Sequence, residues 1–253
     1  PRFTIKWLLF LTLQMLHGGG GSIVKLNSGG FEDIVIAINP RVPEDERIIA
    51  NIKVRFQSKD LVNTKCLLFC LLLHVKEYSV PFQADIIVAD PYLKYGDHPY
   101  TLQYGGCGEQ GPYIHFTPDF LTNDSFLSVY GSRGRTFVHE WAHFRWGVFD
   151  EYNRNAPFYA TGPRTAEATR CSAGISGQYI LPLSTVETRP CKIEHRTGLY
   201  EPGCQFIPDK VQSTSASIMY MQGLPSVSMT KGNQFVFGNL TISIIYFFAL
   251  CDL

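Results

Sequence analysis

The feature that most constrains the fold is the sequence His-Glu-Trp-Ala-His at residues 139–143. In an α-helix, residues four positions apart lie about 40° apart around the axis and about 6 Å apart along it. A helix would therefore direct the imidazoles of His139 and His143 to one point, where they can hold a metal ion. Glu140 would lie roughly 100° around the helix from His139, so that its carboxylate flanks the site without being a ligand.

The residues around this motif predict such a helix. From Ser132 to Trp146 the pattern is helical, and Phe137, Trp141 and Phe144 recur at spacings of four and three residues, as on the buried face of a helix. Gly147 then supplies a residue that ends a helix and lets the chain turn back. We therefore predict a helix over residues 132–146.

Zinc is the metal that these side chains favour. Two imidazoles and one carboxylate leave the fourth position of a tetrahedral zinc site open for water, whose pKa the ion lowers to about 7. Asp150 follows His143 by seven residues and is the predicted third ligand, and Glu151 is the alternative ligand or a supporting partner. With Glu140 as the base for the attacking water, the motif predicts hydrolysis.

Each assignment has a structural alternative. Metzincins place the third ligand one residue sooner and usually use histidine. The alternative for Asp150 is therefore a solvated acidic side chain just past a helix. The alternative for His139 and His143 is a histidine pair that binds no metal. Residues 217–221 provide a methionine where metzincins have a methionine turn beneath the metal, or this methionine is an ordinary core residue. The other histidines have no partner at ligand spacing and are expected to be structural or exposed: His17, His74, His98, His115 and His195.

The charge balance excludes some partners. The 253 residues include 22 basic and 22 acidic side chains, so no overall field attracts nucleic acid or an anionic membrane. Residues 1–21 have a basic start, a short apolar stretch and small residues at the end, which resembles a signal peptide; the alternative is a buried helix. We therefore expect a protein that is secreted or lies on the extracellular face of the plasma membrane.

The cysteines agree with an oxidising compartment. There are seven, so at least one is unpaired. Cys171, Cys191 and Cys204 lie in a stretch rich in glycine and proline, where disulfides would replace a missing core. Asn123 and Asn239 begin glycosylation sequons.

The rest of the chain indicates an α+β fold with a mixed sheet. Residues 30–38, 84–89 and 111–116 are apolar runs bounded by turn residues, and each predicts a strand. A helix is predicted to begin at residues 43–46, where proline is followed by acidic residues. Residues 151–217 are predicted to form an irregular region that contains cysteines and is tied by disulfides.

Residues 224–253 are predicted to be an atypical apolar tail. The stretch 235–250 is apolar apart from a few small polar residues. At 16 residues it is long for a strand but short for a membrane-spanning helix, which needs about 20. We therefore do not expect a membrane anchor, which is the alternative for this segment.

Residues 139–152 resemble the calcium-activated chloride channel regulator family. Further stretches resemble the N-terminal domain of that family: residues 90–93, 99–105, 113–118, 130–135, 169–172, 197–201 and 217–219. The resemblance covers roughly residues 22–55 and 80–223, and motifs of this length are specific. Residues 56–77 and 224–253 do not resemble the family and look like translated intron or alternative sequence.

The resemblance implies a secreted or cell-surface glycoprotein with a zincin-like metallohydrolase domain at residues 22–223. In full-length members, a von Willebrand factor type A domain and β-rich modules follow. It also implies proteolytic self-processing and modulation of a separate chloride channel. Motif matching then assigns zinc to His139, His143 and Asp150 and acid-base catalysis to Glu140.

Three functions remain open on the sequence. The first is a zinc endopeptidase that cleaves a peptide or its own chain. The second is a non-catalytic secreted modulator of chloride conductance, which a Glu140→Gln variant that still modulates the channel would favour. The third is an inactive truncated product, because residues 56–77 stand where part of the sheet is expected and would leave exposed strand edges.

Overall fold

The computed structural model describes residues 24–27, 30–32, 34–56, 74–75, 84–162, 164–170, 173–184, 186–214 and 216–225. The predicted signal peptide, His17, Cys171, Asn239, most of residues 56–77 and nearly all of the predicted tail lie outside these residues. The described part of the chain forms two compact units. One comprises residues up to 104 with 110–123, and the other comprises 105–109 with the residues from 124 on. Within the described ranges, every helix is too short or too polar to cross a membrane.

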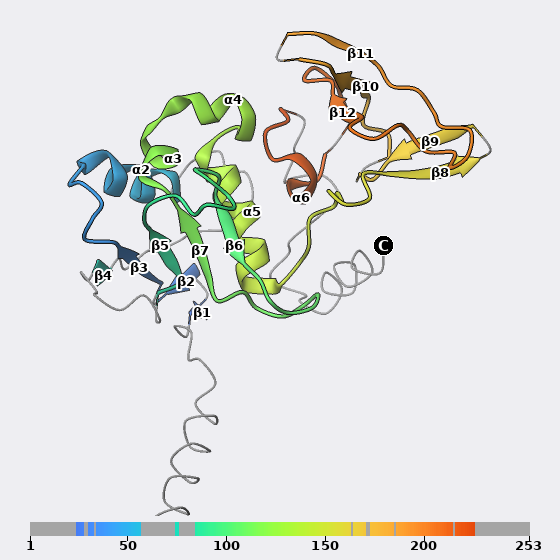
Figure 1. Ribbon diagram of the computed structural model, residues 1–253. Coiled ribbons are helices and arrows are strands. Elements are labelled where there is room, and N and C mark those ends of the chain that lie inside the picture. The colour runs from blue at the N-terminus through green and yellow to red at the C-terminus, as the bar shows by residue number, and fades with distance from the viewer. Residues whose placement is uncertain are drawn as a thin grey trace, which may run out of the picture. The chain divides into compact units, whose positions relative to one another are not determined.

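The first unit contains a five-stranded mixed sheet with the order β4-β3-β5-β7-β6 (Figure 1). Its strands are β3 (Val35–Ile38), β4 (His74–Val75), β5 (Ile86–Val88), β6 (Tyr100–Leu102) and β7 (Tyr113–Phe116). All neighbouring pairs are parallel except β6 with β7, which is antiparallel. The mixed sheet and the strands predicted at 84–89 and 111–116 are confirmed.

The core of this sheet is made by isoleucines in register. Ile36 pairs with Ile86, and Ile86 pairs with Ile114, across three neighbouring parallel strands. Their exposed fractions are 1%, 0% and 0%. Parallel strands covered on both faces require continuous apolar runs, which is why these segments are readable from the sequence. Burying each such side chain contributes about 1.5–3 kcal/mol.

The stretch 30–38, predicted as one strand, contains two. β2 (Gly30–Glu32) pairs antiparallel with β1 (Lys25–Asn27) in a separate hairpin, whereas β3 joins the parallel sheet. The single-strand prediction is therefore wrong. An apolar run predicts extended backbone, but it carries no information about which neighbour each part of the run pairs with.

Helix α2 (Glu46–Phe56) begins where the sequence predicts. Ile48 and Ile52, four residues apart, are each 3% exposed, so one face of the helix is buried. The side-chain amide of Asn51 donates to the Leu121 carbonyl at 2.8 Å, which links α2 to α3 (Pro118–Thr122).

The second unit contains the predicted motif helix, α5 (Arg133–Trp146). The Ser132 hydroxyl accepts from the first turn of the helix, and Gly147 ends it in the left-handed conformation. Phe137, Trp141 and Phe144 are each 1% exposed, and neighbouring ring centres lie 5.5 and 5.2 Å apart. The predicted helix and its aromatic core residues are confirmed. Three short helices accompany it: η3 (Asp124–Phe126), α4 (Leu127–Tyr130) and α6 (Ile218–Met221).

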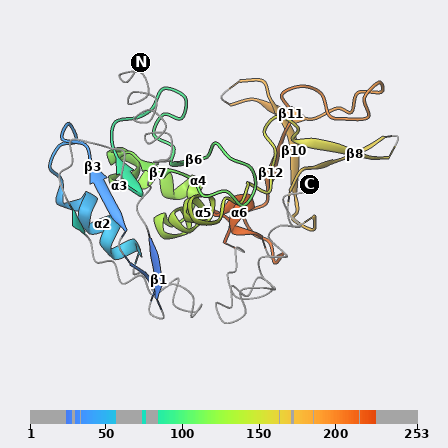
Figure 2. The ribbon, with the colours of Figure 1, turned by 90° about the horizontal axis from the view of Figure 1, so that it is seen from below.

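Five short strands form two small sheets in the same unit (Figures 1 and 2). They are β8 (Phe158–Gly162), β9 (Thr165–Ala168), β10 (Gly177–Pro182), β11 (Thr188–Pro190) and β12 (Gln205–Pro208). β8 pairs with β9, and β10 lies between β11 and β12. The prediction of irregular structure over residues 151–217 is therefore wrong. Most residues of these strands are exposed or half-buried, so the sequence lacks the apolar alternation that indicates a strand.

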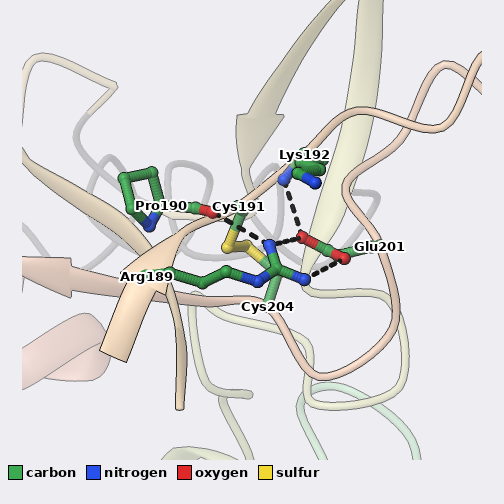
Figure 3. Close-up of a disulfide and its surroundings, with 6 residues drawn as sticks. All are labelled: Arg189, Pro190, Cys191, Lys192, Glu201 and Cys204. Carbon is green, nitrogen blue, oxygen red and sulfur yellow. Dashed lines mark hydrogen bonds and ion pairs between the residues drawn. A yellow bond between two sulfur atoms is a disulfide. The ribbon is translucent and has the colours of Figure 1, made fainter. Parts of the chain in front are cut away.

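A disulfide joins Cys191, just after β11, to Cys204, just before β12 (Figure 3). Beside it, the two terminal guanidinium nitrogens of Arg189, Nη1 and Nη2, donate to the two carboxylate oxygens of Glu201. With a sequence separation of 13 between its two cysteines, the crosslink stabilises the fold by about 3 kcal/mol, largely by restricting the unfolded chain. Cys107 is disulfide-bonded as well. The expectation that disulfides tie this part of the chain is confirmed for Cys191 and Cys204, and Cys171 lies outside the described residues.

Replacing Gly147 by alanine is expected to destabilise the protein. The glycine has φ of 62°, where a side chain costs about 1–2 kcal/mol, and a Cβ there would collide with the backbone of Glu109. We expect the free energy of unfolding, measured by urea denaturation, to fall by at least about 2 kcal/mol. Gly106→Ala is the matched control, because its Cβ would meet only a Glu109 carboxylate oxygen at 3.9 Å. Equal losses in the two variants would contradict this account.

Candidate metal centre

Helix α5 brings two imidazoles together. His139 and His143 are 5% and 9% exposed, and their Nε2 atoms lie 3.2 Å apart. Their ring planes are nearly perpendicular, at 85°. The four-residue spacing on the helix therefore directs both rings to one point, as the sequence predicts.

Backbone carbonyls hold the two rings in position. His139 Nδ1 lies 2.9 Å from the Ile218 carbonyl oxygen, and His143 Nδ1 lies 2.6 Å from that of Val148. Because a carbonyl oxygen only accepts hydrogen bonds, each neutral ring carries its proton on Nδ1. Each Nε2 therefore presents a lone pair to the common point, which is the tautomer that a metal ligand needs.

Asp150 completes the group. Its Oδ1 atom lies 3.2 Å from His139 Nε2 and 3.3 Å from His143 Nε2. The left-handed turn at Gly147 reverses the chain after α5, and the Glu151 N–H donates to the Met219 carbonyl at 3.0 Å. In the described part of the chain, the converging ligand atoms belong to the two histidines and Asp150, not to Glu151.

These three atoms fit a metal ion. Two nitrogen lone pairs and a carboxylate oxygen at 3.2–3.3 Å repel one another unless a proton or a metal cation lies between them. Asp150 Oδ1 is buried and accepts no hydrogen bond from any described residue. In tetrahedral geometry, zinc–ligand bonds of about 2.0–2.1 Å place ligand atoms about 3.3–3.4 Å apart. The separations therefore match the edges of a zinc tetrahedron.

The electrostatics also suit a cation. Burial alone would raise the pKa of Asp150, but the adjacent imidazoles of His139 and His143 outweigh it and hold this pKa well below its usual value. Burial lowers the pKa of His139, and the Asp150 and Glu140 carboxylates outweigh it and raise this pKa. Asp150 is thus an anion at neutral pH, which is the form that binds metals.

Glu140 is a buried carboxylate beside this group. It is 5% exposed, and its charge is one of the causes that raise the pKa of His139. The pKa of the Tyr130 phenol is raised mainly by burial and, second, by the charge of Glu140. A buried carboxylate whose charge acts on both His139 and Tyr130 is close to the region where a base would act. Its role as the base stays a prediction.

The segment with the predicted methionine turn contacts the centre through its backbone. Met219 is 2% exposed, and the residue before it, Ile218, provides the carbonyl that orients His139. Of the other histidines, His115 lies in β7 at 5% exposure, stacked on Tyr100 with ring centres 4.9 Å apart, and His195 is exposed. The expectation that these two histidines are structural or exposed is confirmed.

Sequence reasoning missed the groups that orient the ligands. The carbonyls of Val148 and Ile218 could not be found, since every residue has a carbonyl and no residue type marks these two. It also missed Tyr130 and Tyr152, whose pKa values are raised, that of Tyr152 to about 12, by burial and then by the charges of Glu140 and Asp150. The position of Tyr152, two residues after a predicted ligand, was the available signal.

Fold and site together define an α+β protein with a His-His-Asp group that could hold a metal ion. The family model described as "Calcium-activated chloride channel N terminal" matches residues 24–69 and 74–234. The chain therefore belongs to the calcium-activated chloride channel regulator family.

Known relatives agree with this family. The chain is 50% identical to calcium-activated chloride channel regulator 3A-1 of Mus musculus, over 88% of this chain and 27% of the relative. It is 49% identical to calcium-activated chloride channel regulator 1 of Bos taurus, over 90% of this chain and 27% of the relative. It is 46% identical to calcium-activated chloride channel regulator 4 of Homo sapiens, over 87% of this chain and 26% of the relative. The chain thus spans about a quarter of the length of these relatives. No solved structure matches it significantly.

The family match extends further than the sequence alone indicated. The prediction that residues 56–77 and 224–253 do not resemble the family is wrong for residues 56–69, 74–77 and 224–234, which the family model matches. A diverged segment has few conspicuous motifs, whereas a family model adds weak agreement over many positions. These parts are therefore not foreign to the family.

Replacing a ligand should abolish metal binding. We expect the purified chain to hold one zinc ion and His139→Ala to lose it, because two ligands remain where three are needed. Asp150→Asn should weaken binding, since a neutral amide replaces the anion between the two imidazoles. The measurement is zinc content after dialysis against a weak chelator, with exposed His195→Ala as the matched control. Equal zinc in all four proteins would refute the assignment.

Proposed function

We propose that this chain is the zinc-dependent metallopeptidase domain of an extracellular chloride channel regulator, with a zincin-like fold. The observation that carries the proposal is the convergence of His139 and His143, on the buried helix α5, with Asp150, which follows that helix, at 3.2–3.3 Å. Structural histidine pairs do not need a carboxylate oxygen placed between two Nε2 lone pairs. A hydrolytic metal site does, and it leaves one position open for substrate or water.

The residues divide the chemical work. A zinc ion held by three protein ligands polarises a carbonyl group and lowers the pKa of water. His139, His143 and Asp150 hold the ion, and the carbonyls of Val148 and Ile218 keep the two rings from rotating. Glu140 takes a proton from the attacking water and delivers it to the leaving amine, which makes it the general base and then the general acid.

The expected setting is outside the cell. The Cys191–Cys204 disulfide supports an oxidising compartment, where such bonds persist. The substrate is a peptide segment, either of another protein or of the longer chain to which this domain belongs. A partner chloride channel at the cell surface is part of the proposal, because the relatives are named as chloride channel regulators.

The same names favour a second candidate function. The domain would then be a non-catalytic module that modulates chloride conductance by binding, with the metal group serving only stability. The two candidates differ in whether the Glu140 carboxylate is needed.

Glu140→Gln separates them. The amide keeps the size of the side chain but accepts no proton, so we expect kcat for peptide cleavage to fall by about 10²–10⁴-fold while zinc content stays unchanged. Cleavage is followed by mass spectrometry on a mixed peptide library. Removing zinc with 1,10-phenanthroline should stop cleavage, and added zinc should restore it.

The control is Glu187→Gln, which makes the same chemical change at an exposed position. Chloride current is measured beside cleavage for each variant. If Glu140→Gln and Glu187→Gln cleave alike, the peptidase proposal fails. Channel modulation that persists unchanged in Glu140→Gln would instead support the non-catalytic module.

A further inference from the structure

A pocket of about 510 Å³ lies within the second unit. This volume falls in the range of roughly 300–1,000 Å³ that is usual for ligand pockets. Five aromatic side chains line it: Tyr130, Tyr152, Phe158, Phe206 and Tyr220. Of the described residues that line it, Arg154 is the charged one and none is acidic. The pocket is therefore apolar on its walls and positive at one point.

The Arg154 guanidinium is available to a ligand. It is exposed and forms no ion pair with any described residue. Its Nη2 donates weakly to the Tyr152 hydroxyl at 3.5 Å, and its Cζ lies 5.8 Å from the centre of the Tyr152 ring. A guanidinium carries five N–H donors, so this single contact leaves others free for an anion.

The pocket adjoins the metal centre through two of its walls. Tyr152 follows Asp150 by two residues, and its ring centre lies 6.5 Å from that of Tyr220. Tyr220 belongs to α6, the helix whose Ile218 carbonyl orients His139. The same short elements thus carry both the ligand set and the pocket wall.

Tyr130 connects the pocket with the proposed base. Burial raises the pKa of its phenol, the charge of Glu140 raises it further, and the charge of Arg154 lowers it. Tyr130 therefore lies within electrostatic reach of both residues.

The disulfide fixes the wall of the pocket that residues 204–207 form. Cys204 lines the pocket together with the start of β12, including Phe206, and its bond to Cys191 joins β12 to the end of β11 (Figure 3). The Phe206 ring also packs at a tilt against that of Tyr179 in the neighbouring β10, with ring centres 5.0 Å apart. A wall held in this way is already in place before a ligand binds, which lowers the entropy cost of binding.

We propose that this pocket binds a carboxylate-bearing part of a peptide substrate, with Arg154 as the residue that determines specificity. The inference rests on the proposed peptidase function and names its substrate class. The aromatic walls cover the methylene groups of the bound residue, and the guanidinium pairs with the carboxylate in a fork of two hydrogen bonds. A glutamate side chain and a C-terminal carboxylate offer this same chemistry.

Binding to the Glu140→Gln variant tests the proposal without cleavage. Fluorescent eight-residue peptides with an amidated C-terminus carry one glutamate at successive positions, each matched with a glutamine peptide. We expect at least tenfold tighter binding for glutamate at one position, measured by fluorescence anisotropy. A glutamine peptide with a free C-terminus is the second arm. Tighter binding found only for the peptide with a free C-terminus supports the proposal and shows that the recognised carboxylate is that of the chain end.

The added substitution Arg154→Gln should remove this preference, Arg154→Lys should retain part of it, and Arg196→Gln, at an exposed position outside the pocket, should leave it unchanged. Unchanged zinc content and melting temperature show that each variant folds. Equal binding of glutamate and glutamine peptides in both arms overturns the proposal, as does a preference that survives Arg154→Gln.

Cleavage by the chain with Glu140 intact separates this proposal from the peptidase function. Binding that depends on Arg154, without cleavage of any peptide, refutes the peptidase and leaves the pocket assigned to carboxylates. Cleavage that shows no acidic preference, with kcat/KM equal for glutamate and glutamine peptides, refutes the pocket assignment alone.

Discussion

The approach of two imidazole nitrogens and one carboxylate oxygen to 3.2–3.3 Å is the interaction on which the rest of this site depends. Like partial charges would separate if the side chains were free to move. They are held because α5 is buried and because the carbonyls of Val148 and Ile218 fix both rings. A metal cation would relieve this repulsion, so the fold around α5 brings together a group that could hold a metal ion.

The elements around the helix serve more than one purpose. The left-handed turn at Gly147 brings Val148 and Asp150 back to the site, one through its carbonyl and the other through its side chain. Helix α6 orients His139 and also contributes Tyr220 to the neighbouring pocket. The ligand group and the pocket therefore share these elements, and a shift in either element would alter both.

The sequence allowed much of the architecture to be predicted. Helix α5, the glycine that ends it and the buried strands β5 and β7 follow from apolar periodicity and from the position of that glycine. The division of residues 30–38 between two sheets, and the five strands after α5, were not predictable in this way. Short strands that are half exposed have no apolar alternation, and strand pairing is decided by partners far away in the chain.

By itself, the sequence determined the two histidines, the neighbouring Glu140 and the stop at Gly147, because spacing along one helix is a local property that backbone geometry sets. The sequence predicted Asp150 as a ligand but did not determine where its side chain lies relative to the two imidazoles. Only the tertiary structure decided that Asp150 lies between the two rings, that Ile218 and Val148 orient them, and that Arg154 faces an aromatic pocket. Such contacts depend on how separate elements pack, and packing is a property of the whole chain.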